Sequence, residues 1–213
     1  MTRFPLAALA PLTALALLAA CGSDPAADTA PADPQDAFWQ ALASHCGQAY
    51  GGALTEGDER DAEMQGAEMA MHVRECSDAE IKVPFHIRGD DGDWDRSRTW
   101  VLTRTAQGLR LKHDHRHEDG TSDAVTMYGG DTAEPGTARA QAFPVDQESV
   151  ALFRREGLDV SVTNVWRVEV DPKGAPNARF AYQLERTGDN ARLFRVEFDL
   201  TNSIQPPPAP WGH

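Results

Sequence analysis

The stretch "RFAYQLERTGDNARLFRVEFDL", residues 179–200, decides the fold class of this chain. Apolar side chains occupy every second position on both sides of the turn signal "TGDN". Because successive side chains of a β-strand point to opposite faces, the pattern predicts an antiparallel hairpin with one face in a core and the other in water. The alternating set is Phe180, Tyr182 and Leu184 before the turn, and Phe194, Val196, Phe198 and Leu200 after it.

The same alternation recurs along most of the chain, separated by turn signals such as "GDDGD" and "PKGAPN". Two short helices interrupt it, at 37–47 with Asp36 as the candidate cap and at 146–157 with Asp146 as the cap. Many short strands with tight turns predict a mostly β domain, either a single antiparallel up-and-down β-barrel or a β-sandwich. About ten strands are expected, near 48–54, 68–76, 81–87, 98–105, 109–117, 123–129, 137–143, 162–170, 179–186 and 193–200.

A meander of about ten strands after a short helix resembles the calycin barrels, which include the lipocalins, the fatty-acid-binding proteins and the haem-binding nitrobindin type. Tyr50 in "GQAYGG" stands near the place where lipocalins carry the Trp of their Gly-x-Trp motif. The resemblance is one of architecture. It implies a barrel that could hold a small ligand, and it assigns no activity.

The first twenty-one residues indicate export and a lipid anchor. Arg3 precedes an apolar run from Leu6 to Leu18 that is too short to span a bilayer and is typical of a secretory signal peptide. The sequence "LAAC" at 18–21 resembles the lipobox of bacterial lipoproteins. This resemblance implies that residues 1–20 are removed and that Cys21 is acylated, which anchors the protein to a membrane of the cell envelope. Gly22, where an Asp would favour the inner membrane, favours the outer membrane.

The segments that flank the barrel differ from it in composition. Residues 21–36, with the lipidated cysteine followed by a proline-rich polar stretch, predict a disordered tether. The barrel domain is expected at 37–204 and a proline-rich tail at 205–213. The formal net charge of −13 argues against a nucleic-acid partner. With Cys21 assigned to lipid, Cys46 and Cys76 remain, and an exported protein with two such cysteines is expected to pair them in a disulfide.

A series of ordered blocks covers most of residues 38–200: "FWQAL", "HCGQAY", "MHVREC", "SRTWVLTR", "LKHDHRHEDG", "VTMYGGDT", "NVWRVEV" and "FRVEFDL". Together these blocks resemble a family of bacterial secreted proteins and lipoproteins of unknown function. The resemblance brings no activity and no assigned site.

The segment "LRLKHDHRH" (109–117) holds the best candidates for a site. One face of this strand carries Leu109, Leu111, His113, His115 and His117, while the other carries Arg110, Lys112, Asp114 and Arg116. We expect the charged face in water, which turns the histidines inward near the mouth of the barrel. Tyr128 becomes their neighbour in one of two strand registers. Histidines in such a place could be structural, contact a small ligand or haem, or bind a metal ion.

A metal site would need residues beyond this strand. Side chains at i and i+2 lie about 6.7 Å apart, close enough to share one ion, whereas i and i+4 are too far apart. A third ligand could come from His72 or from Glu118 and Asp119 in the following turn. In a metal-dependent hydrolase, Glu118 or Asp119 would act as the general base.

The sequence contains no nucleophile elbow, P-loop, Cys-x-x-Cys or dinucleotide fingerprint, which favours a binding module over an enzyme. We therefore expect a membrane-anchored, periplasm-facing lipoprotein whose barrel binds a small apolar or metal-bearing ligand. The alternatives are the metal-dependent hydrolase and a structural envelope protein with no ligand.

Overall fold

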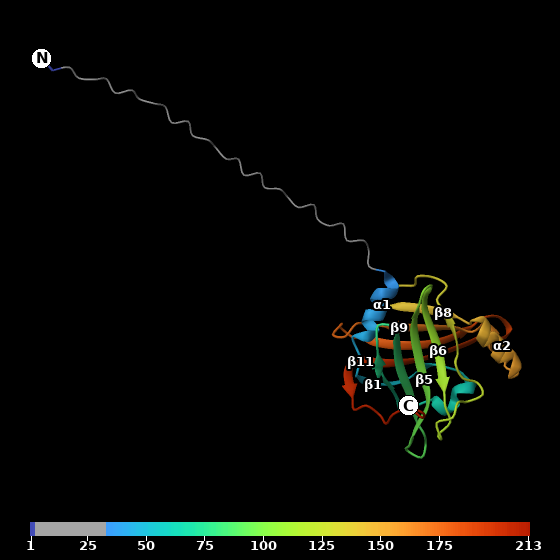
Figure 1. Cartoon of the computed structure of the whole chain (residues 1–213). Helices are drawn as coiled ribbons and strands as arrows, with labels where there is room; N and C mark the ends of the chain where they lie inside the picture. Colours follow the sequence, from blue (N-terminus) through green and yellow to red (C-terminus); the bar gives the residue numbers. More distant parts are fainter. Residues whose placement is uncertain (3–32) are drawn as a thin grey trace. The chain divides into compact units, whose positions relative to one another are not determined.

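The computed structural model describes residues 1–2 and 33–213, and it confirms the mostly β class and the calycin-like barrel. A single antiparallel sheet runs in the order β7-β6-β5-β4-β2-β1-β11-β10-β9-β8 and curls until its two ends almost meet (Figure 1). A sandwich of two sheets is therefore not the architecture. The strands are β1 (Ala49–Glu56), β2 (Met69–His72), β3 (Glu75–Cys76), β4 (Glu80–Arg88), β5 (Trp94–Thr105), β6 (Gly108–His115), β7 (Tyr128–Asp131), β8 (Ala140–Pro144), β9 (Val165–Val170), β10 (Arg179–Arg186) and β11 (Arg192–Ile204).

The helices are α1 (Pro34–Ala43) and α2 (Gln147–Arg155), with short 3-10 turns η1 (Glu59–Met64), η2 (Asp159–Thr163) and η3 (Gly188–Asn190). Asp146 caps α2 as predicted, because its side chain accepts a hydrogen bond from the Ser149 amide. Asp36 does not cap α1. The helix begins three residues earlier than expected, at Pro34, with Asp33 as the cap, so the barrel domain includes residues before 37.

Helix α1 lies at one end of the barrel (Figure 1). Phe38, Trp39 and Leu42 are buried on one side of it and join the core. Gln35 at its start donates a hydrogen bond to Thr132 just after β7, and the turn between β5 and β6 packs against the same side chain. The far ends of β6 and β10, which carry His115 and Arg186, therefore form the opposite end of the barrel. We call this end the mouth.

The two ends of the sheet meet at a narrow seam between β7 and β8. One bridge pairs Gly130 with Val145, and the Asp146 amide donates to the Gly129 carbonyl over 3.0 Å. The backbones approach so closely that a Cβ atom on Gly130 would lie 1.9 Å from the Pro144 carbonyl oxygen. The absence of a side chain at this position is what allows the barrel to close.

Several strand boundaries differ from those predicted. The segment expected as a strand at 123–129 is irregular up to Met127, whose φ is +54°, and β7 begins only at Tyr128. Likewise, β6 ends at His115 and not at His117. The 3-10 turn η2 replaces the start of the strand predicted at 162–170. These differences all lie near the mouth, where the chain leaves the sheet to form loops.

The proline-rich tail, expected at 205–213, follows β11 and returns to the outside of the barrel. The Trp211 amide donates to the Arg96 carbonyl, and the Arg96 guanidinium donates to the Ala209 carbonyl. At the end of the chain, His213 lies 2.9 Å from Asp114 on β6. The tail thus covers part of the outer faces of β5 and β6.

The structure confirms the disulfide between Cys46, just after α1, and Cys76 on β3. We expect that replacing both cysteines by Ser lowers the free energy of unfolding by about 3 kcal/mol, because the bridge closes a loop of about 30 residues in the unfolded chain. Urea unfolding of the double variant beside the parent measures the loss. Two free thiols in the denatured, unreduced parent would contradict the pairing itself.

Candidate functional site

His113 faces the barrel interior and is fully enclosed, with 3% of its surface exposed. Its Nδ1 lies 3.0 Å from the Tyr128 carbonyl oxygen and its Nε2 lies 2.8 Å from the Tyr182 hydroxyl. A carbonyl can only accept, so Nδ1 carries the proton and Nε2 accepts from the tyrosine. Burial, reinforced by the nearby His115, lowers the pKa of His113 to about 3, and the ring is neutral.

Aromatic rings surround His113 on the interior side. The Tyr128 ring stacks on it at a centroid distance of 4.6 Å, and Trp166 lies at 5.1 Å. Tyr182 stacks in turn on Trp100 at 4.5 Å, and burial holds the pKa of the Tyr182 hydroxyl well above its usual range. The hydroxyl is therefore protonated and is held as the donor to His113.

The same Tyr–His–carbonyl arrangement occurs at the closed end of the barrel. His45 contacts the Tyr50 hydroxyl at 2.7 Å and the Asp171 carbonyl at 2.8 Å, and it is completely buried. His45 and Tyr50 are buried in the packed core just after α1. There, a histidine held between a tyrosine hydroxyl and a backbone carbonyl is an internal hydrogen-bonding arrangement. By the same reasoning, His113 holds the wall of the inner cavity in place.

His115 is partly exposed at the edge of the barrel interior. It lies two residues further along β6 than His113, closer to the mouth, and its Nε2 is 3.3 Å from the Tyr128 hydroxyl. Burial and the facing Arg98 lower the pKa of His115 to about 4, and burial raises the pKa of Tyr128 to about 12. Both groups are neutral at physiological pH, and together they offer hydrogen-bond donors and acceptors at the edge of the aromatic interior.

Two hollows meet at this edge. An inner one of about 130 Å³ reaches down to Phe85, Trp100 and His113, and an outer one of about 390 Å³ extends toward α2 and η2. The outer volume falls within the range of ordinary small-molecule sites. The residues common to both hollows are His115, Tyr128, Tyr182, Leu184 and Arg192.

Arginines line the mouth, and most of them have acidic partners. Arg192 donates to Asp61 over 2.5 Å and to Asp58 over 3.4 Å. Arg98 pairs with Asp95. Both arginines border the inner hollow, so the small cavity combines flat aromatic walls with fixed positive charges. The site is more polar than the apolar interior that the sequence predicted.

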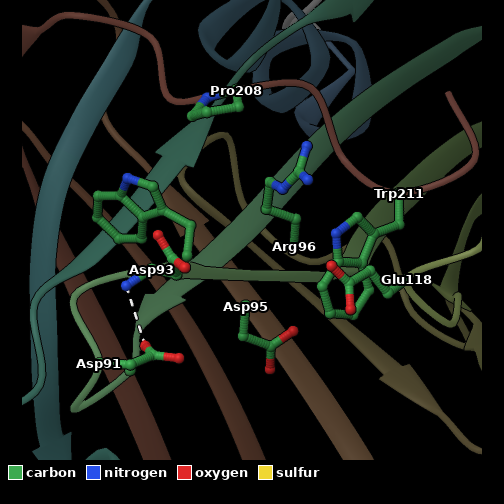
Figure 2. A pocket seen from close by; sticks show the side chains of 9 residues that line it. Asp91, Asp93, Asp95, Arg96, Glu118, Pro208 and Trp211 are labelled. Carbon is green, nitrogen blue, oxygen red and sulfur yellow. Dashed lines mark hydrogen bonds between the residues drawn. The ribbon is translucent and has the colours of Figure 1, made fainter.

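His117, Glu118 and Asp119 do not join the site, contrary to the sequence-based hypothesis. His117 follows the end of β6, has an exposed side chain and lies 3.9 Å from Asp123. Asp119 accepts two hydrogen bonds from Thr121 within its own turn. Figure 2 shows Glu118 on the outer face of the barrel, in a separate hollow that it shares with Arg96, Pro208 and Trp211. The strand ends two residues before His117, so the alternation no longer places these side chains.

His72 does not approach the other histidines of the predicted metal site either. It sits on the outward face of β2, on the same face as Ala70, which is paired with His86 of β4. Both ring nitrogens of His113 are already engaged in hydrogen bonds, and its ring centroid is 6.5 Å from that of His115. Across residues 1–2 and 33–213, no group of three or more His, Cys, Asp or Glu side chains is placed to hold a metal ion.

The charged face of the histidine strand is not in water as expected. Lys112 is 7% exposed and donates to Asp146 over 2.7 Å, which ties β6 to the capping residue of α2. Asp114 is 5% exposed and is covered by Arg116 and His213. Helix α2 and the C-terminal tail, which lie far from β6 in the sequence, bury this face.

Several residues of the site were not identified from the sequence as candidates. They belong to the alternating pattern of β10 and β11, where Tyr182 and Leu184 share their face with Arg186, and Phe194 with Arg192. Arg186 lies two residues after Leu184, and Arg192 lies two residues before Phe194. Continuing the alternation by one step toward the turn on each strand would have identified both arginines as inward-facing.

Compared with protein-family models and with curated proteins, the chain matches none. Cys21 and residues 3–20 of the predicted signal peptide lie outside the described residues. Of the helices that the structure describes, none combines the length and the apolar character needed to cross a membrane.

Proposed function

We propose that this protein is a lipid-anchored component of the cell envelope whose barrel binds a small ligand at its mouth. The observation that carries the proposal is the meeting of the two hollows at His115 and Tyr128. Neutral hydrogen-bonding groups stand there beside the flat faces of Trp166 and Tyr182. A concave site with aromatic walls and a few convergent polar groups is the usual form of a small-molecule site.

The ligand is expected at the mouth because the deeper interior is filled. Trp100 stacks on Phe85 at 4.8 Å and on Phe180 at 5.7 Å, and Phe198 packs edge-on against the same tryptophan. Little space is left between these rings for a bulky apolar molecule. A ligand that inserts one flat end into the inner hollow and rests in the outer one fits the available volume.

Replacing His115 by Ala tests this proposal. We expect retention of bound small molecules to fall about tenfold or more, because the variant removes a polar group at the junction of the two hollows. The free energy of unfolding should change by less than about 1 kcal/mol, since the ring is only partly buried and its single bond to Tyr128 is long. Native mass spectrometry of protein purified from its host measures retention, and urea unfolding measures stability.

His117→Ala is the matched control, because that side chain is exposed and lines neither of the two hollows. Unchanged retention together with a large loss of stability in His115→Ala would assign the histidine a structural role. Protein that never carries a bound molecule, in any preparation, would favour an envelope protein without a ligand.

The lipid anchor is proposed from the "LAAC" sequence and rests on Cys21. We expect Cys21→Ala to abolish incorporation of labelled palmitate and to move the protein from the membrane fraction to the soluble fraction, because acyl chains would be its only hold on the bilayer. Fractionation of cells that express each form provides the measurement. A variant that stays in the membrane fraction would require another means of attachment.

A further inference from the structure

Arg186 is the last inward-facing residue of β10 and stands at the rim of the outer hollow. In the register of the hairpin it lies directly opposite Arg192 of β11. Like charges in directly opposed positions on one face of a sheet repel each other. The pair therefore needs compensation from elsewhere.

That compensation is unequal. Arg192 has two carboxylate partners, Asp61 and Asp58. Arg186 has only the Val160 carbonyl, at 3.1 Å from Nη1, although it is 92% buried, with 8% of its surface exposed. Within the described residues its buried Nε has no hydrogen-bond partner, and no carboxylate lies within ion-pair distance of the guanidinium.

A buried cation without an acidic partner is costly unless something satisfies it. The outer hollow next to Arg186 is also bordered by Arg60 and Arg192. Among the lining residues one carboxylate is present, Asp123, and it accepts a hydrogen bond from the Val125 amide and faces His117. Arg60 is paired with Asp58, and Arg192 with Asp58 and Asp61. Among the described residues that line the outer hollow, Arg186 is therefore the arginine without a carboxylate partner.

We infer that Arg186 is the subsite for an acidic group of the ligand, a carboxylate or a phosphate, whose body rests against Tyr128 and Trp166. The inference rests on the proposed function and specifies its ligand class. The planar guanidinium matches the two oxygens of either group, and the protein leaves its buried Nε without a hydrogen-bond partner. The aromatic walls select a flat body for the same molecule.

Four compounds of one shape test the inference on the purified full-length protein: 2-naphthoate, 2-naphthyl phosphate, 2-naphthamide and 2-naphthalenemethanol. We expect one of the two anions to bind about 10- to 100-fold more tightly than the two neutral compounds, because a hydrogen bond to a charged group is worth about that factor. Which anion binds better distinguishes a carboxylate from a phosphate ligand. Quenching of tryptophan fluorescence, with Trp166 in the site, and calorimetry measure the affinities.

Arg186→Met should remove the preference for the anion and leave binding of the neutral compounds unchanged. Its melting temperature without ligand should be no lower than that of the parent, because an unpaired buried charge has been removed. Arg186→Lys keeps the charge without the planar fork and should give an intermediate affinity. Arg154→Met, an exposed position on α2, makes the same change of net charge as a control.

The outcomes separate the two proposals. Equal binding of anions and neutral compounds overturns the role of Arg186 and leaves the mouth as a small-ligand site. An anion preference that survives in Arg186→Met also overturns it. Binding of none of the four compounds counts against both the site and the subsite. A large drop in melting temperature in Arg186→Met and in Arg186→Lys would make the arginine a structural residue.

Discussion

Gly130→Ala is expected to prevent the barrel from closing and to lower the free energy of unfolding by at least about 3 kcal/mol. The new Cβ atom would lie 1.9 Å from the Pro144 carbonyl oxygen, and backbone cannot move aside as a flexible side chain can. Gly130 forms the one bridge between β7 and the end of β8, so any shift that relieves the overlap also breaks the seam. For a domain of ordinary stability, this loss is a large share of the total.

The loss should be visible in two measurements. Urea unfolding followed by circular dichroism gives the change in stability, and hydrogen exchange should show faster exchange at β7 and β8 than elsewhere in the sheet. Gly51→Ala on β1 is the matched control. A Cβ atom there would meet only the Ile204 side chain, at 3.9 Å, and the change should be neutral or slightly stabilising.

An unfolding midpoint in Gly130→Ala equal to that of the parent would mean that the seam is looser than the structure has it. The placement of Tyr128 at the mouth would then also be in question, because Tyr128 is the first residue of β7. The seam holds that strand against β6, where His113 pairs with Tyr128. Closure of the barrel and placement of the site thus depend on the same short strand.

The fold was predictable from the sequence because burial alternates so regularly. On β10 and β11 the inward set Phe180, Tyr182, Phe194 and Val196 is buried as the period of two requires. Such regularity needs only local information, since each residue's face follows from that of its neighbour. The inward direction of His113 was predictable for the same reason.

The composition of the site was not predictable to the same degree, because it depends on contacts between distant segments. The sequence predicts Lys112 and Asp114 to be solvent-exposed. They are buried because α2 and the C-terminal tail, from distant parts of the sequence, pack over them. Glu118 and His117 follow the end of β6, a boundary that periodicity cannot locate in a run of polar residues. The partner of His113, Tyr182, comes from a strand 69 residues away.

Acidification is expected to destabilise the protein well before its carboxylates titrate. Between pH 7 and pH 5 the free energy of unfolding should fall by roughly 4 kcal/mol, at up to about 1.4 kcal/mol per pH unit for each buried histidine. Burial lowers the pKa of His113 to about 3 and, together with nearby Arg96, lowers that of His86 to about 4. His115, with its pKa lowered to about 4, contributes less because it is partly exposed.

The sign of this pH dependence follows from the protonation of the histidines in the folded and unfolded states. In the unfolded chain these rings take up a proton near pH 6.5, whereas in the folded protein they stay neutral until the pH is far lower. Below pH 6.5 the unfolded state therefore binds more protons, and stability is lost as the pH falls toward 4. Carboxylates with a lowered pKa, such as Asp114 and Asp146, act in a different window, since their contribution is lost only below about pH 4.

Urea unfolding at pH 7, 6 and 5 measures how the free energy of unfolding changes with pH. Single histidine variants then show which ring contributes to this change. His113→Gln should reduce stability at pH 7 and also make the dependence on pH clearly shallower, because the histidine with the lowest pKa no longer contributes. His117→Gln should leave the slope unchanged, since that side chain is exposed. A free energy of unfolding that stays constant from pH 7 to pH 5 would mean that the histidines are hydrated in the folded state. The enclosed hydrogen bonds that His113 donates to the Tyr128 carbonyl and accepts from the Tyr182 hydroxyl would then be wrong as well.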